Sequence, residues 1–155
     1  MGSYLNPGSF SFRGSLRSKI YVDKSELIAK INEVLYTEQK YICVSRPRRF
    51  GKSMAANMLA AYYDRSENTE ELFQNLMISK DSSYRENLNQ YDVIKINVQE
   101  FLSLSGTIEE MLQMLRDYLL SDFKEAYHEV HFRDEKNIIQ VMKDVFSYTK
   151  CPFVI

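Results

Sequence analysis

Apolar residues recur along much of the chain at the spacing of one helical face. The first such face comprises Leu27, Ile28, Ile31, Val34 and Leu35. Asp23 and Thr107 are each followed three residues later by a glutamate, Glu26 and Glu110, which is the spacing of a capping box at a helix start. These patterns predict helices over residues 23–35, 52–63, 70–77, 107–123 and 138–146.

Three short apolar runs predict strands. They are Tyr41–Val44, Val93–Val98 and Pro152–Ile155. Because predicted strands alternate with predicted helices, the chain is expected to have an α/β fold with a largely parallel sheet. Residues 1–22, which contain Asn6-Pro7-Gly8-Ser9, predict an irregular lead-in, and residues 23–155 a single partial domain. Since the third run ends with the chain, we expect the N-terminal portion of a longer protein.

The composition narrows the class of protein. With 155 residues, 45% hydrophobic and 26% charged, the chain has the length and core of one folded domain, which excludes global disorder. A formal net charge of −1 argues against a surface built to coat nucleic acid or an anionic membrane. The longest apolar run, Met58–Tyr63, is too short to span a bilayer, and no signal peptide is visible. Two distant cysteines, Cys43 and Cys151, predict reduced thiols, so we expect a cytoplasmic protein without membrane contact.

Positive charge is concentrated in one stretch, between Gln39 and Tyr63, that contains no acidic residue. Its positive residues are Lys40, Arg46, Arg48, Arg49 and Lys52. A cationic patch on an otherwise mildly acidic chain favours a small anionic partner.

The basic stretch contains a candidate phosphate-binding loop between the predicted strand at 41–44 and the predicted helix at 52–63. Set against the pattern G-x-x-x-x-G-K-[ST], residues 46–53 supply Gly51, Lys52 and Ser53 but have Arg46 in place of the first glycine. Pro47 also stiffens the loop entry, so its shape must differ from the usual one. The strand–loop–helix placement favours phosphate binding, with a solvated basic loop at a helix start as the alternative.

Each residue of the pattern has a physical role. Gly51 lets the backbone approach phosphate oxygens, while the amides of residues 49–53 lie at the positive end of a helix dipole. Lys52 reaches the outer phosphates and is the predicted catalytic residue, and the Ser53 hydroxyl is the predicted ligand of Mg²⁺. The predicted cofactors are ATP and Mg²⁺. The predicted nucleotide-binding residues are Arg46, Arg48, Arg49, Phe50, Gly51, Lys52, Ser53 and Met54.

The loop Arg46-Pro47-Arg48-Arg49-Phe50-Gly51-Lys52-Ser53 resembles that of the AAA-ATPase-like family of bacterial proteins, which departs from the glycine pattern in this way. Residues 6–10, 21–28, 71–78 and the strand ending Ile96-Asn97-Val98 are also similar to that family. The resemblance implies a P-loop NTPase sheet flanked by helices and ATP binding. It also implies, later in such proteins, acidic residues of the Walker B type and often a nuclease-like PD-(D/E)XK domain, a route to nucleic acid.

Other candidate residues have simpler interpretations. His128 and His131 have a metal-ligand spacing, but a solvated helix end accounts for them better. Both cysteines border predicted strands and are expected in the core. Phe10 and Tyr21 precede the loop, where adenine stacking is an alternative to plain packing.

The sequence therefore predicts Mg-nucleotide binding through a variant Walker A loop, with hydrolysis of the γ-phosphate expected in the longer protein. Two alternatives stay open. One is a P-loop kinase acting on a small acceptor, and the other is a nucleic-acid-associated or regulatory interaction module that uses the basic loop. Salt dependence separates nucleotide from nucleic acid, because counterion release is larger for nucleic acid.

Overall fold

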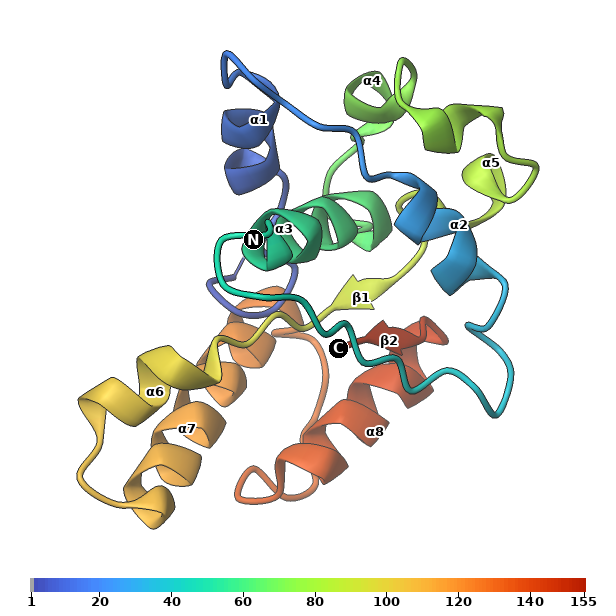
Figure 1. Ribbon diagram of the computed structural model, residues 1–155. Helices are drawn as coiled ribbons and strands as arrows, with labels where there is room; N and C mark the ends of the chain where they lie inside the picture. Colours follow the sequence, from blue (N-terminus) through green and yellow to red (C-terminus); the bar gives the residue numbers. More distant parts are fainter. Residues whose placement is uncertain (1) are drawn as a thin grey trace. The chain divides into compact units, whose positions relative to one another are not determined.

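The computed structural model describes residues 2–155, which divide into two compact units (Figure 1). The loop unit comprises Gly8–Tyr91, and the sheet unit comprises residues 2–7 together with Asp92–Ile155. In this described part of the chain, no helix has the length and apolar character needed to cross a membrane.

The loop unit is helical and contains the whole candidate phosphate-binding loop. Its elements are α1 (Phe10–Leu16), α2 (Glu26–Asn32), α3 (Lys52–Tyr63), α4 (Glu70–Phe73), the 3₁₀ helix η1 (Met77–Lys80) and α5 (Tyr84–Asn87). The bounds of α3 are those that the apolar pattern predicts. Between α2 and α3 the chain turns at residues 33–39 and then runs without regular structure up to the start of α3 (Figure 1).

Aromatic rings from three helices form the core of the loop unit. The ring of Tyr62 in α3 lies edge-to-face against Tyr63 and against Phe73 of α4, with ring centroids 4.8 Å and 5.4 Å apart. Phe73 in turn stacks on Phe12 of α1, with centroids 5.1 Å apart. All four side chains are fully buried. Because such rings bury a large area and prefer fixed relative orientations, they set the position of α3 and therefore of the loop before it.

The sheet unit carries two short strands and three helices. They are β1 (Asp92–Val93), α6 (Val98–Leu104), α7 (Ile108–Ala126), α8 (Ile138–Thr149) and β2 (Phe153–Val154). The strands pair in parallel, with Asp92 opposite Phe153 and Val93 opposite Val154. The parallel pairing agrees with the predicted α/β class, and the fold is a mostly helical α/β fold with a small parallel sheet.

Two long helices and the strand region form the core of the sheet unit. Its buried members are Leu5, Ile94, Leu119, Phe123, Val141 and Val145. The capping prediction for α7 is confirmed, since the Thr107 side chain accepts a hydrogen bond from the Glu110 amide at 3.1 Å. Asn137 caps α8 in the same way through the amides of Ile139 and Gln140.

Several local predictions differ from the structure, including the bounds of the helices predicted at 23–35 and 70–77, which are α2 (Glu26–Asn32) and α4 (Glu70–Phe73). The predicted strand at Tyr41–Val44 is wrong: the segment belongs to no strand, and Tyr41 is 85% exposed. An apolar run becomes a strand only where neighbouring chain pairs with its backbone, and the described chain provides no such ladder here. Part of the predicted irregular lead-in is helical, as α1. The strand predicted at Val93–Val98 is shorter in the structure: β1 ends at Val93, Ile94 forms an isolated bridge with Leu5, and α6 begins at Val98. Finally, the N-cap of α2 is Ser25, because Asp23 accepts hydrogen bonds from the amides of Ser25 and Met77.

Candidate functional site

The loop ends at a glycine whose backbone conformation only glycine adopts readily. Gly51 is the N-cap of α3 and has φ 80° and ψ 24°, in the left-handed region. Its carbonyl accepts the first helical hydrogen bond, from Ala55 N at 2.9 Å. In the part of the chain that the structure describes, no side chain caps this end of α3. The first-turn amides therefore stay available to an external acceptor at the positive end of a helix dipole.

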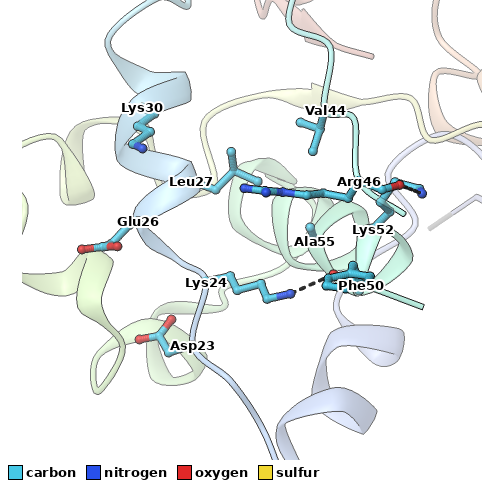
Figure 2. A pocket seen from close by; sticks show the side chains of 11 residues that line it. Asp23, Lys24, Glu26, Leu27, Lys30, Val44, Arg46, Phe50, Lys52 and Ala55 are labelled. Carbon is cyan, nitrogen blue, oxygen red and sulfur yellow. Dashed lines mark hydrogen bonds between the residues drawn. The ribbon is translucent and has the colours of Figure 1, made fainter. Parts of the chain in front are cut away.

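Lys52 folds back across the loop that precedes it. Its ammonium donates hydrogen bonds to the carbonyl oxygens of Arg46 and, at 3.3 Å, of Pro47 (Figure 2). The lysine therefore holds the two ends of the loop together through neutral acceptors, which leaves its positive charge uncompensated.

A cavity of about 380 Å³ lies beside the loop. Leu27, Val44 and Ala55 contribute apolar surface, and Figure 2 shows the Arg46 side chain reaching across the cavity toward Leu27. The charged or polar lining comes from Asp23, Lys24, Glu26, Lys30, Arg46 and Lys52. A concave site with an apolar wall and several cations fits a ligand that combines a ring system with anionic groups.

The cations around the loop have no acidic partners. Within residues 2–155, no carboxylate oxygen lies within 4.0 Å of a charged nitrogen of six of them: Lys24, Lys30, Arg46, Arg48, Arg49 and Lys52. Elsewhere in the protein, Arg13 pairs with Glu67 and Glu71, and Arg133 pairs with Asp144. The unpaired cations produce a local positive potential that favours a bound anion.

The structure brings together only part of the predicted site. Arg46, Phe50, Gly51 and Lys52 line the cavity. Arg48, Arg49, Ser53 and Met54 do not line it and are solvent-exposed neighbours on the loop and on the first turn of α3. Their predicted contacts with nucleotide and metal therefore remain predictions.

Two cationic residues of the cavity, Lys24 and Lys30, come from an earlier part of the chain. Lys24 precedes α2, and its ammonium donates a hydrogen bond to the Phe50 carbonyl at 2.8 Å (Figure 2). Nothing in the local pattern places either lysine near residues 46–53. The similarity of residues 21–28 to an ATPase-like family is the one signal in the sequence that points to this segment.

The other candidates from the sequence lie outside this site. His128 and His131 are exposed, and among the described residues no group of three or more His, Cys, Asp or Glu side chains could hold a metal ion. Cys151 is buried as predicted, whereas Cys43 is exposed because the segment around it joins no sheet. Tyr21 packs edge-on against Phe12 at 6.3 Å, and burial raises the pKa of Tyr21 to about 12. Phe10 is 86% exposed.

Comparison with known protein families identifies the family of this chain. Residues 11–155 match the model of the family described as Predicted AAA-ATPase. The chain belongs to this family. No curated protein and no solved structure matches it. Membership in the Predicted AAA-ATPase family covers both units and supports an ATPase-type function for the chain.

Proposed function

We propose that this member of the Predicted AAA-ATPase family binds ATP with Mg²⁺ through residues 46–54, a variant Walker A loop. The observation that carries the proposal is the N-terminus of α3. It follows a left-handed glycine, and within the described residues it has no side-chain cap and lies among cations without acidic partners. Backbone amides at such a helix start, together with lysine, are the groups that bind phosphate in nucleotide sites.

In this proposal each loop residue has its own role in binding the nucleotide. The amides of residues 49–53 cradle phosphate oxygens, and Gly51 keeps side-chain atoms away from them. Lys52 exchanges the carbonyls of Arg46 and Pro47 for phosphate oxygens, since charged acceptors form stronger hydrogen bonds than neutral ones. Arg46 supplies a further cation where other loops have a glycine. Hydrolysis of ATP, by attack of water on the γ-phosphate, is the expected chemistry in the whole protein.

The residues present also fit magnesium. Mg²⁺ in nucleotide sites keeps several waters and takes few protein ligands besides the substrate phosphates. In P-loop sites the protein ligands are a Ser or Thr hydroxyl at the helix start and an acidic residue, and the exposed Ser53 hydroxyl on the first turn of α3 fits the first of these roles. The ion would neutralise phosphate charge, while the chain's own part is to orient the phosphates against the helix N-terminus.

The proposal predicts a specific loss on substitution of Lys52. Lys52→Ala should weaken Mg-ATP binding by roughly 30- to 1000-fold, because a charge-assisted contact to phosphate contributes on the order of 2–4 kcal/mol. Isothermal titration calorimetry of parent and variant measures this change. Lys40→Ala is the matched control, since it removes the same charge from the same basic stretch outside the cavity. Equal affinity of the parent and Lys52→Ala proteins would contradict the proposal.

The second candidate function is binding of a nucleic-acid backbone to the same basic loop. The unpaired cations favour it as well, because phosphodiester groups are anions that arginine and lysine contact readily. The two functions differ in salt dependence. A nucleic acid that contacts several cations loses affinity steeply as salt rises, whereas a single nucleotide does so less steeply. Titration of ATP and of a short single-stranded oligonucleotide at two salt concentrations separates them.

A further inference from the structure

The loop unit holds Lys24 in a fixed position beside the loop. The residues on either side of it, Asp23 and Ser25, are both tied to η1. The Asp23 carboxylate accepts a hydrogen bond from the Met77 amide at 2.7 Å, and the buried Ser25 hydroxyl accepts one from the Ile78 amide at 3.0 Å. Two tethers flank Lys24, so its backbone does not have the freedom of an ordinary surface lysine.

The Lys24 side chain ends directly at the glycine of the loop. Its Nζ atom donates to the Phe50 carbonyl at 2.8 Å, and it lies 3.1 Å from the place where a Cβ atom on Gly51 would stand. The missing side chain at Gly51 therefore provides room for the ammonium as well as conformational freedom. The helix N-terminus of α3 begins at the same glycine.

The charge of Lys24 is not compensated in this position. An ammonium has three N–H donors, and within the described residues one of them is bonded, to a neutral carbonyl. The neighbouring acids are turned elsewhere: Asp23 binds two backbone amides, and in Figure 2 the Glu26 carboxylate and the Lys24 ammonium point in opposite directions. Lys24 and Lys52 line the same cavity at the positive end of a helix, and an anion that binds there is attracted to both lysines.

We infer that Lys24 is a second phosphate-binding lysine, which contacts the polyphosphate of the nucleotide together with Lys52. The inference rests on the proposed nucleotide site and adds a ligand to it from outside the loop pattern. On binding, Lys24 keeps its Phe50 bond and offers its two remaining donors to phosphate oxygen. Nucleotide is thereby linked to η1 as well, because Lys24 is held through Asp23 and Ser25.

The test compares Lys24→Met with Lys19→Met in the whole protein. Both changes remove one exposed lysine charge from the loop unit, but only Lys24 lines the cavity and is bonded to the loop. Mg-ATP titrations at low and moderate salt, with Lys52→Ala in parallel, give the affinities, and thermal melting without nucleotide gives the stability of each variant. Lys24→Met should weaken ATP binding about tenfold and reduce its salt dependence, because one direct charged hydrogen bond is lost. Lys19→Met should change the affinity by less than about twofold, and neither change should alter the melting temperature.

The outcomes distinguish the inference from the proposal on which it rests. Normal ATP affinity in Lys24→Met, with lost affinity in Lys52→Ala, would overturn the role of Lys24 and leave the nucleotide site intact. A lowered melting temperature with the parent's salt dependence would show that Lys24 only holds the loop in place, which also overturns the inference. If the parent protein binds no ATP, both the inference and the proposed function are wrong.

Discussion

The path of the loop depends on two left-handed backbone conformations that are separated by one residue. Arg49 has φ 68° and Gly51 has φ 80°. At Gly51 this conformation costs little, whereas at an arginine it costs about 1–2 kcal/mol. Strain of this kind is retained where surrounding contacts enforce it and is common at ligand sites. The carbonyls of Pro47 and Phe50, on either side of Arg49, accept hydrogen bonds from Lys52 and Lys24.

Arg46 is the residue at which this loop departs most from the glycine pattern, and its charge is testable separately from its size. Arg46→Gln keeps the bulk and removes the charge, so it should weaken Mg-ATP binding by about 1–2 kcal/mol, the range for a partly exposed charged hydrogen bond. Arg46→Gly removes the bulk too and gives the loop entry a glycine, so it reports on shape. Calorimetric titration of both variants at two salt concentrations decides the matter. If Arg46→Gln binds like the parent, the arginine acts through loop shape alone.

At the residue scale, the sequence predicts the site residues that belong to the loop but not Lys24, which lines the cavity from another segment. Gly51 and Lys52 are predictable because their roles follow from the backbone and charge requirements of phosphate at a helix start. Lys24 lies in a different element, and its approach to Phe50 results from the packing of α2 against η1, which no local pattern encodes. The sequence also predicts Cys43 in the core, but this residue is exposed. Apolar neighbours in the sequence do not by themselves bury a side chain.

At the element scale, helices with a continuous apolar face are the most predictable feature. The pattern predicts α3 with its bounds and α8 with its start, because tertiary packing uses the same face that the periodicity marks. The pattern does not predict α1, because its sequence FSFRGSL contains a glycine and has no regular spacing of apolar residues. Its buried residue, Phe12, packs into the core against Phe73. The pattern misassigns Tyr41–Val44, since strand formation depends on partners that a local pattern does not report.

The position of α3 also depends on a buried polar network centred on Asn32 of α2. The Tyr63 hydroxyl donates to the Asn32 amide oxygen at 2.7 Å, and the Asn32 amide nitrogen donates to the Tyr62 hydroxyl at 3.2 Å and to Ser83 at 2.9 Å. Burial raises the pKa of Tyr62 to about 12, so both phenols stay neutral donors and acceptors over the physiological range.

Removing the centre of this network should destabilise the loop unit. Asn32→Ala leaves the buried Tyr63 hydroxyl without its acceptor, so the free energy of unfolding should fall by about 1–3 kcal/mol. Urea unfolding of parent and variant measures the loss. Asn75→Ala is the control, because Asn75 is exposed, and it should change stability by less than about 0.5 kcal/mol. A loss in Asn32→Ala no larger than in the control would mean that the network does not hold α2 to α3.

An acid-sensitive contact anchors α8 in the sheet unit. The Asp144 carboxylate accepts hydrogen bonds from the Arg133 backbone amide at 2.9 Å and from its guanidinium at 2.7 Å. These bonds, the amide first, lower the pKa of Asp144 from 3.8 to about 2. A carboxyl whose pKa is lower in the folded state stabilises the fold above the pKa of the unfolded chain, and this contribution disappears as the folded group is protonated.

The pH dependence of the Asp144→Asn variant follows from that sign. At pH 6 the parent should be more stable than Asp144→Asn, and the gap should shrink as pH falls from about 4 toward 2. Chemical unfolding at a series of pH values provides the comparison. A gap of constant size over that range would show that the carboxylate charge does not contribute to stability.

At the scale of the whole molecule, the charge distribution favours a local anion site over a general polyanion surface. The net charge of −1 gives no long-range attraction for nucleic acid, yet among residues 2–155 the cations around residues 46–52 have no acidic partner. The family match extends over residues 11–155 and so covers most of the loop unit and most of the sheet unit. The division into two units is not visible in composition, because residues 2–7 join a unit whose remainder begins at Asp92.

The central claim is that the nucleotide phosphates lie on the backbone amides at the start of α3. Amide hydrogen exchange with and without Mg-ATP tests it most directly, because bound phosphate should slow exchange of the amides that it contacts. We predict slower exchange in a peptide covering residues 46–54, with no change in a peptide from α8, and loss of the effect in Lys52→Ala. Binding of ATP without slower exchange in residues 46–54, or with the protection confined to the sheet unit, would contradict the account.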